Sequence, residues 1–308
     1  MKLTNRQFVV ALESEDIEVG ETLIRRAPEA MKRLVEITGL PEPTRRVGVT
    51  IFRRRKQFYN KVFGRAWASG ETAPVGAVGE TYGNDKDSAK GEDSAKGEAR
   101  ARGEATPADV IAATPSFRFL GYIGPPRGVL MLSPDRWEVK DRDQFLPVFY
   151  HELTHYLVNS HIKVGRLPDW FAEGLADYAA GRLKPEWSEM REQVCRDFVR
   201  TELKGDSFVS FLRSPVPQQQ ACYVRDILHE QGFSSCFGSL LLKELAIDGG
   251  NARFIKKTLQ AMRDEPKLTF NEALGNSMDI GYSGVESFAL SLFSRLKNDD
   301  ESTSPSRT

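Results

Sequence analysis

The stretch 149-FYHELTHYLVNSH-161 determines the fold that we expect of this 308-residue chain. The chain contains only four histidines, and three of them fall within this stretch. His151 and His155 are four residues apart, so in a helix both imidazoles project from the same face, one turn apart. The apolar residues have the spacing of a helix with one buried side. They are Phe149, Leu153, Leu157 and Val158.

Glu152 completes the pattern His151-Glu152-Leu153-Thr154-His155. Two histidines at this spacing can bind one metal ion, and a glutamate beside them can act as general base on a water at that ion. The alternative is a pair of ordinary helix histidines with a surface glutamate, which match the pattern by chance.

The next segment, 166-RLPDWFAEGLADYAAG-181, supplies a third candidate ligand. Glu173 falls within an apolar stripe of a second helix, and a carboxylate at a core-facing position is costly unless it is paired or binds a metal. Asp177 follows four residues later on the same face, where it can accept the free N–H of a ligand histidine. The alternatives are an ordinary glutamate of an amphipathic helix for Glu173 and a surface carboxylate for Asp177.

Together, HELTHYL and LPDWFAEGLADY resemble the gluzincin clan of zinc metallopeptidases. Within that clan the chain is similar to the bacterial peptidase-MA-like families, whose third-ligand segment reads W-x-x-E-G-x-A-x-Y. The matching positions are Trp170, Glu173, Gly174, Ala176 and Tyr178. The resemblance covers about residues 149–181 and implies a zincin-like α+β fold. It also implies that His151, His155 and Glu173 bind Zn²⁺ and that Glu152 serves as base and proton shuttle.

We therefore expect zinc-dependent hydrolysis of peptide bonds, with a peptide or protein as substrate. In gluzincins a tyrosine or histidine from a later helix often stabilises the oxyanion, and here Tyr223 is favoured over His229. A core tyrosine and a surface or core histidine are the alternatives for these two residues. The rival function is a non-catalytic zinc-binding domain that binds peptides or acts as a scaffold. The intact Glu152 argues against it, because a structural site gains nothing from a base beside the metal.

The residues before the motif predict an N-terminal α/β portion over 1–148, with a small mixed sheet. Strands are expected over 7–14, 47–52, 117–123 and 128–132, and helices over 21–40 and 53–63. The tandem repeat DSAKGE lies in a low-complexity insertion over about 70–106, which we expect to be disordered. Because zincin-type enzymes hold the substrate backbone at a sheet edge by strand addition, we expect 128–132 to be that edge strand. An interior strand is the alternative.

The residues after the motif predict a mostly helical catalytic portion over 149–296 and a polar tail over 297–308. Expected helices span 144–159, 169–180, 186–203, 218–231, 239–245, 251–262 and 283–296.

The balance of charge and hydropathy excludes several classes of protein. Lys+Arg and Asp+Glu number 43 each, so the excess basic charge of a nucleic-acid or anionic-membrane binder is missing. No apolar run approaches the roughly 18 residues of a membrane helix. The N-terminal apolar block is shorter than a signal-peptide core of about 7–15 residues, so we expect a cytoplasmic protein or one that has lost an export signal. The three cysteines lack the close spacing of a thiolate metal site, and we expect them to be reduced structural thiols. They are Cys195, Cys222 and Cys236, and the alternatives are a Cys222–Cys236 disulfide or a catalytic cysteine.

Overall fold

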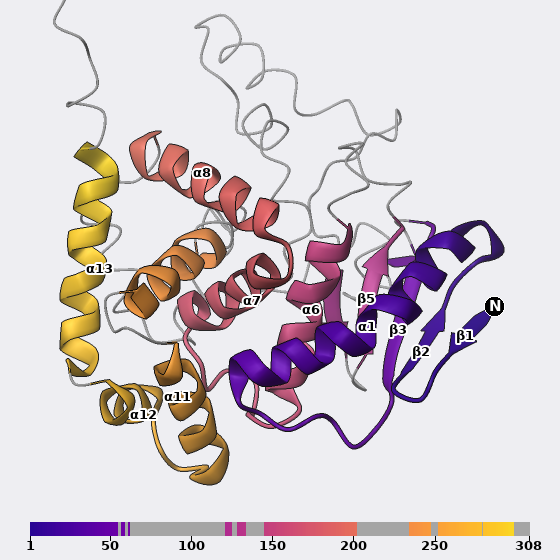
Figure 1. The fold of residues 1–308 in the computed structure, drawn as a ribbon, viewed down its shortest axis with the longest axis horizontal. Coiled ribbons are helices and arrows are strands. Elements are labelled where there is room, and N and C mark those ends of the chain that lie inside the picture. The colour runs from indigo at the N-terminus through magenta and orange to yellow at the C-terminus, as the bar shows by residue number, and fades with distance from the viewer. Residues whose placement is uncertain are drawn as a thin grey trace, which may run out of the picture.

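The structure is a computed structural model and describes residues 1–54, 57–58, 61, 121–124, 128–133, 145–201, 234–247, 252–278 and 280–298. Within these residues a small N-terminal sheet is followed by a mostly helical part, so the fold is mixed α+β (Figure 1). The insertion over 70–106 and the helix expected over 218–231 lie outside the described residues, as do Cys222, most of the helix expected over 53–63 and the end of the polar tail.

Within the described residues, the sheet has five strands in the order β1-β2-β3-β5-β4. Their bounds are β1 Lys2–Thr4, β2 Phe8–Ala11, β3 Val47–Phe52, β4 Gly121–Gly124 and β5 Gly128–Leu132. β2, β3 and β5 run parallel, while β1 and β4 are antiparallel to their neighbours. Buried and partly buried residues alternate along β2 and β3, because successive side chains of a strand point to opposite faces.

The expectation that 128–132 forms the edge strand is wrong. β5 pairs with β3 on one side and with β4 on the other, and Tyr122 lies opposite Leu130 in the β4–β5 register. Only residues 125–127 separate the two strands, so the short apolar run before them folds back as an antiparallel neighbour. β4 therefore occupies this end of the sheet among the described strands.

Two helices cover one face of the sheet. α1 (Ile17–Thr38) packs against β2, and α6 (Phe145–Asn159) packs against β4 and β5. The two helices also contact each other, which places them on the same side (Figure 1). α1 ends at Gly39, whose φ of 69° is the left-handed conformation that glycine adopts most readily at a helix end. That C-terminus agrees with the sequence prediction.

The remaining helices pack beyond α6. α7 (Asp169–Leu183) lies against α6, and α8 (Pro185–Thr201) lies against α7. A helix over 234–247 follows, and then α11 (Arg253–Asp264), α12 (Phe270–Ser277) and α13 (Gly281–Asn298). Buried side chains of the sheet and of the helices form one hydrophobic core, which includes the thiols of Cys195 and Cys236. No helix in the described part of the chain is long and apolar enough to cross a bilayer.

Candidate metal centre

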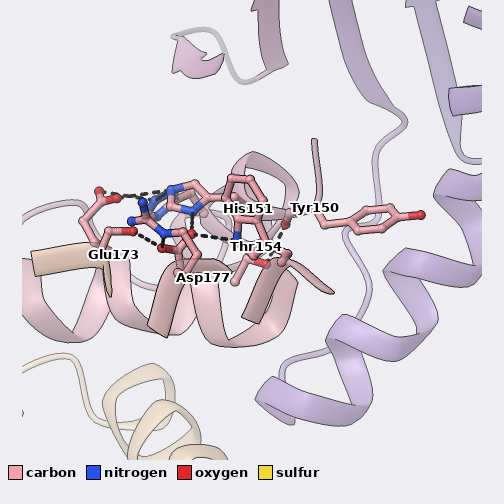
Figure 2. A network of polar contacts seen from close by, with 9 residues as sticks. Tyr150, His151, Thr154, Glu173 and Asp177 are labelled. Carbon is pink, nitrogen blue, oxygen red and sulfur yellow. Dashed lines mark hydrogen bonds and ion pairs between the residues drawn. The ribbon is translucent and has the colours of Figure 1, made fainter. Parts of the chain in front are cut away.

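α6 and α7 bring three potential metal ligands together. His151 and His155 lie one turn apart on α6, and their Nε2 atoms are 3.1 Å apart. Glu173 of α7 places Oε2 3.2 Å from Nε2 of His151 and Oε1 3.3 Å from Nε2 of His155. Figure 2 shows Glu173 of α7 directed toward His151 of α6. The sequence predicted this group of three, and the structure brings all of it together.

The chemistry of these donors fits a divalent metal ion. One ligand atom from each residue lies within 4.8 Å of the other two, so a single ion can contact all three. Two imidazole nitrogens and one carboxylate oxygen suit zinc and several other divalent ions. Nδ1 of His151 is occupied by Asp177 at 2.8 Å, which leaves Nε2 as the nitrogen that faces Glu173. The tautomer that Asp177 favours is therefore the one that metal binding needs.

Asp177 is the centre of a buried polar network behind the three ligands. Its Oδ1 accepts from Nδ1 of His151 and, at 3.3 Å, from Nε1 of Trp187. Its Oδ2 accepts from Nε of Arg191 and from the hydroxyl of Ser235. The sequence prediction placed Asp177 against a ligand histidine but did not include Trp187, Arg191 or Ser235.

The charges of the site favour a cation between the carboxylates. Burial by itself raises the pKa of Glu173, but His155 and His151 outweigh it and hold that pKa well below its usual value. Burial lowers the pKa of His151, yet the hydrogen bonds to Asp177 and Glu173 raise it well above 6.5. The two acids thus favour positive charge at His151, whether that charge is a proton or a metal ion.

Glu152 has the opposite electrostatic setting from Glu173. Burial raises its pKa, and the nearby histidines offset that rise only in part. A carboxylate whose pKa lies closer to neutrality is better suited to take up and release a proton during a reaction.

A pair of glycines lets a fourth helix, over 234–247, reach the network. A Cβ added at Gly174 of α7 would lie 2.6 Å from Cα of Gly238, and one added at Gly238 would lie 2.9 Å from Cα of Gly174. The backbones of α7 and the 234–247 helix are therefore in direct contact at this point. Ser235 lies one turn before Gly238, and Asp177 lies one turn after Gly174, so the crossing sets their hydrogen bond.

Gly238→Ala is expected to destabilise the protein by about 1–3 kcal/mol, because the added methyl group meets backbone atoms that cannot turn aside. The free energy of unfolding in urea measures this. Gly275→Ala in α12 is the matched control, since the nearest atom to its added Cβ is 3.9 Å away. There alanine should stabilise the helix by up to about 1 kcal/mol. Equal changes in the free energy of unfolding of the two variants would contradict the close approach of the two backbones at Gly174 and Gly238.

His161, the third histidine of the opening stretch, is not part of this group of three. Nε2 of His161 donates to the backbone carbonyl of Pro41, 2.9 Å away. Tyr223 and His229, the candidates for oxyanion stabilisation, lie outside the described residues. Trp170 and Phe171 lie on α7 with Glu173 and are buried in the core.

Comparison of the chain with protein-family models, with curated proteins and with solved structures found no match. The chemistry of the site is therefore inferred from the arrangement of its own side chains.

Proposed function

We propose that this protein is a zinc-dependent peptidase with a zincin-like fold. The observation that carries the proposal is the carboxylate of Glu173, which reaches from α7 to both imidazoles of α6. Three protein ligands from two histidines and one glutamate are the set found in catalytic zinc sites of the thermolysin type. Glu152 sits between the two histidines in the sequence and is not one of the three ligands.

The residues of the chain divide the work of peptide hydrolysis. When bound, zinc polarises the substrate carbonyl and acidifies the attacking water. Glu152 takes the proton from that water and then delivers it to the leaving amine, and its raised pKa suits both transfers. Asp177 holds His151 in one orientation through the proton on Nδ1. Tyr223 is the proposed donor to the oxyanion, with His229 as the other candidate.

An extended peptide or protein segment is the proposed substrate. β4 pairs with β5 on one side and is the last strand of the sheet on the other, among the strands that the structure describes. α6 packs against β4, so this edge lies beside the helix that carries His151 and His155. A substrate backbone added to β4 would take hydrogen bonds from the sheet and run alongside the proposed site.

Metal analysis and a peptide-library digest test the proposal. The purified protein should contain one zinc per chain and cleave the library. A chelator should abolish cleavage, and added zinc should restore it. Protein that purifies without stoichiometric zinc and gains none on dialysis against it would refute the site. Zinc-loaded protein that cleaves nothing would support the non-catalytic scaffold instead.

Glu173→Gln is expected to weaken zinc binding by more than 100-fold. Loss of a residue that only supports a ligand typically weakens binding 10–100-fold, and loss of a ligand should exceed that. Competition with a chromophoric chelator measures the Kd. Glu189→Gln makes the same change at an exposed position of α8 and should leave the Kd unchanged. A Glu173→Gln variant that binds zinc as tightly as wild type would show that Glu173 is not a zinc ligand.

A further inference from the structure

The carboxylate of Asp177 has no freedom to turn. Each of its oxygens accepts two hydrogen bonds, from His151 and Trp187 on Oδ1 and from Arg191 and Ser235 on Oδ2. The side chain is only 1% exposed, so water cannot substitute for these donors. A carboxylate with its acceptor positions filled from four directions has one orientation available.

The donors on Oδ2 come from two helices that contribute no metal ligand. Arg191 belongs to α8 and is 4% exposed, and Ser235 belongs to the 234–247 helix and is 5% exposed. Arg191 also lies over the ring of Trp187, with its guanidinium carbon 5.7 Å from the ring centre. Trp187, Arg191 and Ser235 thus fix the carboxylate that orients His151.

From this geometry we infer that Arg191 and Ser235 are positioning residues for the metal centre, acting through Asp177 on His151. The inference rests on the proposed metal site. It extends that site from two helices to four, because α8 and the 234–247 helix then take part in metal binding without contacting the ion.

The charge of Arg191 has a second consequence. Arg191 and Asp177 form a buried ion pair, so the negative charge of Asp177 is balanced inside the protein. The three ligands then carry a single negative charge, that of Glu173, toward a doubly charged ion. A positive excess remains at the centre, which is what the polarisation of a carbonyl oxygen requires.

Loss of either donor should loosen His151. Without the Ser235 hydroxyl, Oδ2 keeps Arg191 as a partner, so the carboxylate is held less firmly. Without Arg191, both the ion pair and the directed Nε–H bond are lost, so the effect should be larger. A role limited to joining the helices would instead change stability and leave the metal affinity as it was.

Zinc affinity in four variants separates these two roles. We would measure the zinc Kd of Ser235→Ala and Arg191→Met by competition with a chromophoric chelator, together with the visible absorption of the Co²⁺-loaded proteins. The matched controls are Ser239→Ala, at a buried serine one turn along the same helix, and Arg196→Met, at an arginine of α8 paired with Glu192. All four variants would first be compared for thermal unfolding without metal.

The expected result is a zinc Kd raised about 10-fold in Ser235→Ala and about 100-fold in Arg191→Met, with both controls within twofold of wild type. The Co²⁺ absorption of the two test variants should also shift. Unchanged affinity in folded test variants, or an equal loss in the controls, would overturn the inference. If Arg191→Met does not fold, Ser235→Ala decides the result alone.

The proposed peptidase activity is judged separately from this inference. Wild type that binds zinc but cleaves no peptide would refute the peptidase, while the comparison of Kd values would still decide the roles of Arg191 and Ser235. Wild type that binds no zinc would refute both.

Discussion

Replacing Glu152 with glutamine is expected to lower kcat by about 10⁴-fold while one zinc per chain stays bound. General acid–base catalysis typically contributes about 10²–10⁴-fold, and the same carboxylate is proposed to take the proton and to deliver it. Glutamine keeps the shape of the side chain and cannot carry that proton. Steady-state kinetics on the best peptide from the library, with zinc content measured in the same preparation, check the prediction.

Glu173→Gln is the informative comparison for this result. It makes the same chemical change one helix away, and it should lose zinc together with turnover, because Glu173 is one of the three converging ligands. Turnover near the wild-type value in Glu152→Gln would exclude Glu152 as the general base. Loss of zinc from Glu152→Gln would show instead that Glu152 helps to hold the metal.

The grouping of His151, His155 and Glu173 could be predicted from the sequence because its parts are local. His151 and His155 lie within one turn of one helix, and Glu173 and Asp177 lie within one turn of the next. Helical periodicity alone puts each pair on one face. The packing of α6 on α7 is the one non-local feature that the prediction required, and the apolar residues of both segments make that packing favourable.

The residues behind Asp177 could not be predicted in this way. Ser235 lies 58 residues beyond Asp177 in the sequence, and their contact depends on the backbone crossing at Gly174 and Gly238. A single serine, an arginine in an amphipathic helix and an isolated glycine carry no pattern of their own. Arg191 could have been identified as a partner of Asp177 only if its burial had been known.

The errors in the predicted fold also arise where a feature depends on contacts between segments that are not local in the sequence. The strand over 128–132 was predicted correctly, but its place in the sheet depends on pairing with β4, which the periodicity of one segment does not reveal. α12 was not predicted, although the sequence contains a helix N-terminal signal. Thr269 and Glu272 form a capping box at its start, but the helix is short and its apolar stripe is brief.

Asp177→Asn is expected to lower the free energy of unfolding of the metal-free protein by about 3–5 kcal/mol at neutral pH. Four donors converge on this carboxylate, and an amide offers one oxygen and two N–H groups in its place. Arg191 would remain buried without its counter-charge, and breaking a buried ion pair from one side has about this cost. Urea unfolding of the two proteins measures the difference.

Glu192→Gln is the matched control for Asp177→Asn. Glu192 of α8 pairs with Arg196 and Lys243, and its side chain is 25% exposed, so its loss should change stability by less than about 1 kcal/mol.

The pH dependence of the stability difference between wild type and Asp177→Asn gives a second check. Burial alone would raise the pKa of Asp177, but Arg191 and His151 hold it well below the ordinary value of 3.8. Its contribution is therefore complete above that value and is lost as the pH falls further. Asp177 also raises the pKa of His151, so the stability gap between wild type and Asp177→Asn should widen slightly from pH 7 to 5. Below about pH 4 the gap should narrow, by at most about 1.4 kcal/mol per pH unit. A gap that instead narrowed between pH 7 and 5 would mean that Asp177 titrates near its ordinary value or above it, and that the four hydrogen bonds do not hold it ionised.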